Sequence, residues 1–323
     1  MSAAYKILIV APSWVGDMVM SQTLLKLLKL KHGTNCQIDV LVNSWALDVV
    51  KRMPEVNQVH VNPFGHGEFG LIKRIKLGFS LRSEHYDQCF VLPNSLKSAL
   101  VPFFAGIQKR TGFVGEMRYG LLNDSYKLDK LALPLMIERF CALANAGHKP
   151  DSIEFPSFSV DTQNQTKVLN RLSLNLLKPV ICLCPAAEYG PAKRWPSIHF
   201  AKLADLLQAQ NYQVWIMGSA KDQSIAEEIV EVIDLLATAA AVVSNDSGLM
   251  HVACALNVPV IAIYGSSSPG FTPPLSKQAV IQKIALECAP CFARTCKFGH
   301  YNCLQGISPE VIFQQIHVAV QNS

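Results

Sequence analysis

The chain has 323 residues, 50% of them hydrophobic, and carries 29 Lys and Arg against 24 Asp and Glu. This length suffices for two domains, and no apolar run approaches the roughly 18 residues that a membrane-spanning helix needs. The first residues do not have the pattern of a secretory signal peptide, so we expect a cytoplasmic protein. The ten cysteines fit a reducing compartment, and the net charge of +5 is compatible with an anionic partner.

Strand-like and helix-like runs alternate along the chain. Short apolar runs predict strands at 6–11, 37–43, 58–62, 88–94, 179–185, 213–218, 240–246 and 258–265. Helical patterns are predicted near 21–30, 46–53, 71–81, 197–210 and 309–320, and from residues 222 and 249 onward. The alternation predicts an α/β protein of two doubly wound, Rossmann-like domains facing a cleft.

The domain boundary is expected in the polar stretch 150–167, which is rich in Pro, Asp, Ser and Gln. This gives domains 1–165 and 166–323, and ligands are expected at the carboxyl ends of the strands. One segment breaks the pattern, because no strand and loop separate the helix near 222 from the strand at 240–246. A deletion and a loop missing from the sequence both explain the gap, and we favour the missing loop, because a skipped strand would break the alternation.

The first strand is followed by the turn APSWVGDM, residues 11–18, which has one glycine and an acid. A carboxylate is a poor neighbour for a phosphate, so this turn, with Ser13, Trp14 and Asp17, is expected to serve an acceptor. An ionised Asp17 can take a proton from a sugar hydroxyl. The alternative role for Asp17, or for Ser13, is to cap the following helix.

Two turns of the second half have features of an anion site. In SNDSGLMH, a strand ends at Asp246, and Ser247 and Gly248 open a helix whose free amides and dipole favour phosphate. His251 lies within reach of such a ligand, although a structural role is the simpler alternative. Lys193, in the loop before Trp195, could neutralise a diphosphate leaving group, or could be a solvated lysine.

Basic residues are frequent in the first half of the chain. Their side chains could hold phosphates or carboxylates, or lie on an anionic membrane, or simply be solvated. The candidates are Lys73, Arg74, Lys76, Arg82, Lys97, Lys109, Arg110 and Arg118.

Four cysteines cluster near the C-terminus, at positions 288, 291, 296 and 303. The spacing is not that of a standard zinc finger, so reduced packing cysteines are favoured over a structural zinc site at Cys288, Cys291, Cys296 and Cys303. No other metal or cofactor is expected.

Taken together, these motifs resemble the ADP-heptose–lipopolysaccharide heptosyltransferases of glycosyltransferase family nine. The matching segments are PSWVGDMVMSQTL at 12–24, RTGFVGEMRYGLLND at 110–124, AxxYGPAKRWP at 186–196, SNDSGLMHVACAL at 244–256 and CxPCFxRTCxFGHxxCL at 288–304. The likeness is greatest to the branch that extends a core already carrying one heptose.

The resemblance implies a GT-B fold and an inverting, metal-independent transfer of L-glycero-D-manno-heptose from ADP-heptose to heptosyl-Kdo2–lipid A. It implies that Asp17 is the catalytic base. The implied donor-binding residues are Lys193, Asp222, Asp246, Ser247, Gly248, Leu249 and His251. The acceptor is expected on Ser13, Trp14, Lys73, Arg74, Arg110 and Arg118. In such folds the last helix commonly crosses back to the first domain.

The expected partners are therefore ADP-heptose, the lipopolysaccharide inner core and, peripherally, the cytoplasmic face of the inner membrane, with no nucleic acid. Two alternatives stay open. The chain could be heptosyltransferase I or III, with a different core acceptor, or a non-catalytic protein that binds a nucleotide sugar. An NAD-dependent oxidoreductase is disfavoured, because no GxGxxG follows any predicted strand.

Overall fold

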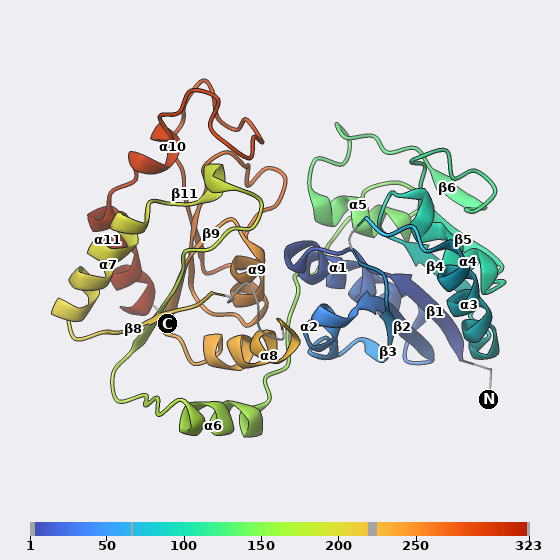
Figure 1. Cartoon of the computed structure of the whole chain (residues 1–323), viewed down its shortest axis with the longest axis horizontal. Coiled ribbons are helices and arrows are strands. Elements are labelled where there is room, and N and C mark those ends of the chain that lie inside the picture. The colour runs from blue at the N-terminus through green and yellow to red at the C-terminus, as the bar shows by residue number, and fades with distance from the viewer. Residues whose placement is uncertain (1–3, 66, 219–224, 322–323) are drawn as a thin grey trace. The chain divides into compact units, whose positions relative to one another are not determined.

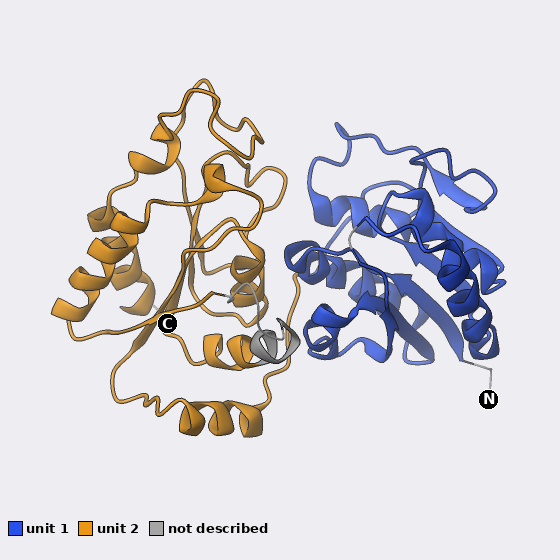
Figure 2. Cartoon of the chain, viewed as in Figure 1, with its two compact units in different colours: residues 1–154 blue, residues 155–323 orange. Residues whose placement is uncertain are grey.

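The computed structural model describes residues 4–65, 67–218 and 225–321. The chain divides into two compact units, residues 1–154 and 155–323 (Figure 2). Each unit is built on a parallel sheet flanked by helices (Figure 1), and the prediction of two Rossmann-like α/β domains is confirmed. The boundary predicted after residue 165 falls inside helix α6 (Thr162–Arg171) of the second unit, so that unit begins earlier than predicted.

The first unit has a six-stranded sheet in the order β3-β2-β1-β4-β5-β6. Its strands are β1 (Tyr5–Val10), β2 (Cys36–Asn43), β3 (Val56–Asn62), β4 (Gln88–Val91), β5 (Lys109–Phe113) and β6 (Asp124–Tyr126). Its helices are α1 (Val15–His32), α2 (Leu47–Lys51), α3 (Leu71–Ser80), α4 (Leu100–Phe104) and α5 (Met136–Leu143). Short 3-10 turns are η1 (Ser44–Ala46), η2 (Leu81–Glu84) and η3 (Leu96–Ala99).

The central strand β1 shows why this sheet forms. Its residues 7–10 are buried, as expected for a parallel strand covered on both faces. Helix α1 follows, buries Leu24, Leu25 and Leu28 against the unit, and ends at Gly33, whose φ of 73° suits glycine. Because β1 lies between β2 and β4, the chain leaves β1 on one side and returns on the other. The carboxyl ends of β1 and β4 therefore form the switch point where such sheets bind ligands.

The second unit has a five-stranded sheet in the order β11-β10-β9-β7-β8. Its strands are β7 (Val180–Cys184), β8 (Gln213–Ile216), β9 (Ala241–Asn245), β10 (Val260–Ile263) and β11 (Ala279–Gln282). Besides α6, its helices are α7 (Ser197–Ala209), α8 (Ile225–Leu236), α9 (Gly248–Ala255), α10 (Asn302–Gln305) and α11 (Pro309–Gln321), with η4 (Pro191–Lys193) as a 3-10 turn. By the same rule, the switch point lies at the carboxyl ends of β7 and β9.

The two sheets differ by one strand. In the first unit β3 lies outside β2, whereas in the second unit β8 ends the sheet and helix α8 leads on toward β9 through residues 237–240. Within the described part of the chain, no strand comes between β8 and β9. A deletion and a loop missing from the sequence both remain explanations of the gap. The five-stranded sheet is continuous, and β7 pairs with β8 on one side and with β9 on the other.

The last helix belongs to the core of the second unit. Ile312 and Ile316 of α11 are fully buried in the cluster that also contains Leu203 and Leu207 of α7. The predicted packing of this helix on the first domain stays a prediction. Among the described residues, no helix has both the length and the apolar character required to cross a bilayer.

Candidate functional site

The switch point of the second unit carries an ion pair. The ammonium of Lys193, at the end of η4, lies 2.6 Å from Oδ2 of Asp246, the residue after β9. The side chain of Asp246 is 4% exposed and that of Lys193 19%. An isolated carboxylate here would repel a phosphate, but Lys193 balances the charge of Asp246. Because an ammonium has three N–H donors, Lys193 keeps hydrogen-bonding capacity for an anionic ligand.

Asn245 holds the loop that carries Lys193, residues 186–196, against this edge of the sheet; we call this segment the lysine loop. Its Oδ1 accepts a hydrogen bond from the backbone N–H of Trp195 at 2.9 Å, and its Nδ2 donates to the carbonyl of Pro185 at 2.8 Å. The indole of Trp195 is buried and donates to the carbonyl of Ile307. The position of Lys193 is therefore set by both ends of its loop. Sequence reasoning missed Asn245, although a polar residue closing an apolar strand beside Asp246 was a usable signal.

The N-terminus of α9 is open for hydrogen bonding. Ser247 is the N-cap residue, but its side chain makes no capping hydrogen bond, and its Oγ lies 3.1 Å from Oγ of Ser244. Gly248 and Leu249 form the first turn, whose backbone amides have no partner within the helix. This terminus can bind an anion such as a phosphate.

Several buried polar atoms at this edge lack a partner. His251, one turn into α9, is 3% exposed, and among the described residues its Nδ1 has no hydrogen-bond partner. Burial lowers the pKa of His251 to about 4, with Asp246 opposing and Lys193 assisting the shift, so the ring is neutral near pH 7. The hydroxyls of Ser266 and Ser267, after β10, are also buried and unpartnered in the described structure. Such atoms are rare in native proteins, and these three can hydrogen-bond with a ligand or with water.

Both serines were missed from the sequence, where the only sign was a run of three small hydroxyl residues, 266–268, after an apolar strand. The remaining predicted donor residue, Asp222, lies outside the described residues.

The switch point of the first unit contains Asp17, in the first turn of α1. The N-cap residue of α1 is Trp14, which makes no side-chain capping hydrogen bond, so neither Ser13 nor Asp17 occupies the N-cap position. Ser13 and Trp14 are exposed, and Asp17 is half-buried. An acidic side chain in the first turn interacts favourably with the helix dipole. The structure thus places the carboxylate at the strand edge where a ligand is expected.

The predicted acceptor cations fall into different environments. Arg74 is buried, stacks on Phe64 and donates to the carbonyls of Glu68 and Phe69. Arg118 is 1% exposed and donates to the carbonyls of Phe113, Pro93 and Ser95; burial lowers its pKa to about 10.

Arg110 donates to the carbonyls of Ile107, Gly120 and Leu121, and Lys73 is exposed and paired with Glu68 at 2.8 Å. The three guanidinium groups therefore organise the chain's own loops, which does not support the prediction that they bind acceptor.

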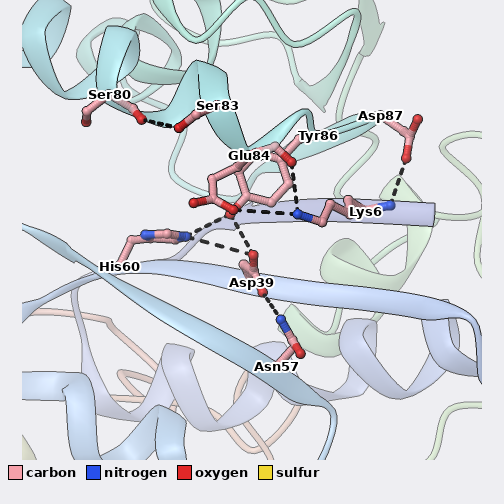
Figure 3. A network of polar contacts seen from close by, with 9 residues as sticks. All are labelled: Lys6, Asp39, Asn57, His60, Ser80, Ser83, Glu84, Tyr86 and Asp87. Atoms are coloured by element: carbon pink, nitrogen blue, oxygen red, sulfur yellow. Dashed lines mark hydrogen bonds and ion pairs between the residues drawn. The ribbon is translucent and has the colours of Figure 1, made fainter. Parts of the chain in front are cut away.

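Figure 3 shows a polar network in the first unit that sequence reasoning missed. Asp39, buried in β2, accepts hydrogen bonds from Tyr86 Oη at 2.7 Å and Asn57 Nδ2 at 2.9 Å. Nε2 of His60 lies 2.7 Å from Tyr86 Oη and 3.9 Å from Asp39 Oδ2. Burial raises the pKa of Asp39, but the nearby His60 and the hydrogen bonds from Asn57 and Tyr86 outweigh this effect, and the pKa lies below the ordinary value. The network joins β2 to β3 and to the segment before β4, which indicates a structural role.

Comparisons with known proteins agree with the motifs. The profile of glycosyltransferase family 9 (heptosyltransferase) matches residues 74–302. Lipopolysaccharide heptosyltransferase 2 of Escherichia coli K12 is 44% identical over 340 positions, covering 97% of each chain. Lipooligosaccharide heptosyltransferase 2 of Haemophilus influenzae is 43% identical, covering 96% of this chain and 98% of its own. The structure of E. coli ADP-heptose lipopolysaccharide heptosyltransferase II matches with a TM-score of 0.85 and 41% identity, covering 98% of this chain and 99% of that one.

The fold, the anion-binding edge and these likenesses define a glycosyltransferase of the GT-B class, as the sequence predicted. The chain belongs to glycosyltransferase family 9, the heptosyltransferases. The resemblance inferred from the motifs is thereby confirmed, and the family model matches part of each unit, including the Lys193 loop and the turn after β9.

Proposed function

We propose that the chain transfers L-glycero-D-manno-heptose from ADP-heptose to heptosyl-Kdo2–lipid A, inverting the anomeric centre. The observation that carries this proposal is the Lys193–Asp246 pair beside the unpartnered Nδ1 of His251 and the open N-terminus of α9. The full-length likeness to relatives named heptosyltransferase 2 supports the choice of acceptor.

The second unit binds the donor in this proposal. The diphosphate lies on the first-turn amides of α9, at Ser247, Gly248 and Leu249, where the helix dipole favours negative charge. Lys193 stabilises the charge that grows on the departing phosphate oxygen. Asp246 and the neutral His251 are then left to hydrogen-bond with sugar hydroxyls. Asp222 stays a predicted ribose-binding residue.

The first unit supplies the base. The carboxylate of Asp17 accepts the proton of the acceptor hydroxyl as that oxygen attacks the anomeric carbon. The bond from this carbon to the phosphate oxygen breaks, and ADP leaves with the electron pair. A single displacement inverts the centre, so one base suffices, whereas a retaining route needs a second displacement. Ser13 and Trp14, which are exposed before α1, contact the acceptor sugar in this proposal.

The acceptor is a lipid, and we propose that α3 lies against the anionic cytoplasmic face of the inner membrane. On this helix Ile72 is 70% exposed and Phe79 50%, and the neighbouring Lys73 and Lys76 are also exposed. Exposed apolar side chains flanked by lysines are typical of peripheral contact with anionic lipid.

The proposal is tested by measuring ADP release from ADP-heptose with core acceptors that carry no heptose, one heptose or two. We expect turnover with the one-heptose acceptor alone, and ADP-glucose serves as the matched donor control. Turnover with the heptose-free or two-heptose acceptor instead would assign the chain to the heptosyltransferase I or III branch. Tight binding of ADP-heptose without turnover on any acceptor would favour the non-catalytic alternative.

A further inference from the structure

The segment between β11 and α10, residues 283–301, has no apolar core of its own. It contains no helix or strand, and no residue from 281 to 303 is buried. Phe292 and Phe298, its two aromatic residues besides Tyr301, are 49% and 69% exposed. A long irregular segment without an apolar core of its own is uncommon in a compact domain, and small units of this kind are usually fixed by a cross-link or a metal.

This segment nevertheless supports the lysine loop. The carbonyl of Arg294 accepts the N–H of Ala192 at 3.0 Å, and Tyr189 Oη donates to the carbonyl of Phe292 at 2.6 Å. Gly190 packs so closely on the same Arg294 carbonyl that a Cβ there would lie 2.4 Å from the oxygen. The main chain next to Lys193 therefore takes its position from a segment that lacks a core.

The four cysteines Cys288, Cys291, Cys296 and Cys303 line one cavity of about 30 Å³ in this segment. The size suits a single small ion or water molecule. The buried, unpartnered hydroxyl of Ser266 lines the same cavity. The chain's other six cysteines differ, because all are buried within the two units and pack as small apolar side chains.

The geometry of the cluster is compatible with a bound cation. Four thiols that line one small cavity cannot all ionise without a positive charge among them, and a divalent metal supplies that charge.

We propose that Cys288, Cys291, Cys296 and Cys303 bind one thiophilic divalent metal ion as a closed four-thiolate site. Four sulfur ligands suit Zn²⁺, with Fe²⁺ as the other common occupant of such sites. Among the described residues, no three His, Cys, Asp or Glu side chains are already gathered as a ligand set, so the thiols turn into the cavity when the ion enters. The ion then fixes residues 283–301 and, through Arg294, the loop that carries Lys193.

The test begins with the metal content of the purified full-length chain, measured by plasma mass spectrometry after exhaustive dialysis. We expect one equivalent of zinc or iron, and Cys296→Ser and Cys303→Ser each lose it. Cys36→Ala, a buried cysteine of β2 purified identically, keeps the metal. A wild-type chain that holds no stoichiometric metal, or cysteine variants that retain it, would overturn the site.

A second measurement does not depend on whether the variants fold. Titrating the accessible thiols of the native wild-type chain with a thiol reagent, before and after treatment with a strong chelator, should show four additional reactive thiols after metal removal. Refilling with Co²⁺ should restore protection and give thiolate-to-cobalt charge-transfer absorption. An unchanged thiol count would refute the site.

The role of the metal in positioning Lys193 rests on the proposed function and is tested separately. The measurement compares the affinity for ADP-heptose of the metal-loaded chain with that of the metal-depleted chain. We expect affinity to fall at least tenfold on depletion and to return on refilling. A site that binds metal while depletion leaves donor affinity unchanged would refute the link to Lys193 and leave the four-thiolate site standing.

Discussion

Replacing Lys193 by Met removes one partner of a buried ion pair and leaves the other. The carboxylate of Asp246 is 4% exposed, so solvent cannot replace the ammonium that lies 2.6 Å away. Breaking such a pair from one side costs about 3–5 kcal/mol. Because Lys193 itself is 19% exposed, water gains some access after truncation, and we expect the lower end, about 3 kcal/mol.

The reverse change should cost less. In Asp246→Asn the ammonium of Lys193 keeps access to solvent and to the amide oxygen, so we expect a loss of about 1–2 kcal/mol. The double variant, Lys193→Met with Asp246→Asn, leaves no buried charge unpaired and should be more stable than the sum of the single changes predicts. Turnover should fall about 10²-fold in Lys193→Met, since stabilisation of the leaving phosphate is lost.

The assay is urea unfolding of the four proteins of this cycle near pH 8. Equal losses for the two single variants, additive losses in the double variant, or a Lys193→Met protein within about 0.5 kcal/mol of wild type would refute the reasoning.

Four further outcomes are expected. Asp17→Asn should lose about 10²–10⁴-fold in turnover while calorimetry shows unchanged ADP-heptose affinity, and near-normal turnover would remove Asp17 as the base. The pKa of His251 is about 4 in the folded protein and 6.5 in the unfolded chain, so the folded ring is neutral at pH 7. This difference contributes about 3 kcal/mol of stability above pH 6.5, which is lost as the pH falls toward 4. In His251→Leu, the midpoint of urea unfolding should therefore change less with pH over this range. The lowered pKa of Asp39 means that its stabilisation is present at neutral pH and is lost on acidification below its ordinary range, so Asp39→Asn should be less stable near pH 7 and lose less on acid titration than wild type. Arg118→Met should lower the unfolding free energy by about 3 kcal/mol, because several buried carbonyls lose their donor, and a loss confined to acceptor binding would contradict its structural role.

Among the strands that the sequence predicted, β1 and β7 have apolar residues on both faces, whereas β3 has no buried residue. Residues 7–10 and 180–184 are buried throughout, and such runs can be recognised without a structure. The strands β5 and β6 at the edge of the first sheet were not predicted, because Lys109–Phe113 and Asp124–Tyr126 are short and polar. Helix α1 begins at Val15, earlier than the predicted start at 21; Gly16 and Asp17 interrupt the apolar pattern in its first turn, although Met18, Val19 and Met20 are buried.

The candidate site was predictable where a single residue stood at the end of a recognisable strand, as Asp246 does. What could not be predicted was pairing across the chain. Lys193 and Asp246 were each assigned a role without the bond between them, which joins residues far apart in sequence. Nothing local in the sequence shows that the carbonyls of Pro93, Ser95 and Phe113 converge on Arg118, which was predicted to bind the acceptor. The sequence alone does not reveal whether a charged side chain binds a ligand or the protein's own backbone.

The ion pair also suggests how an acidic residue can lie beside a diphosphate. Before the donor binds, Asp246 keeps Lys193 in place and neutralises it, which removes the cost of an isolated charge in a mostly buried position. In the proposed donor complex, the diphosphate offers Lys193 a second anion, while the α9 amides hold the rest of the phosphate charge. Because Lys193 then shares its charge with the phosphate, its ion pair with Asp246 weakens, and Asp246 can accept hydrogen bonds from sugar hydroxyls. In this arrangement the carboxylate does not oppose phosphate binding, because it positions the cation that phosphate requires and couples recognition of the sugar to recognition of the nucleotide.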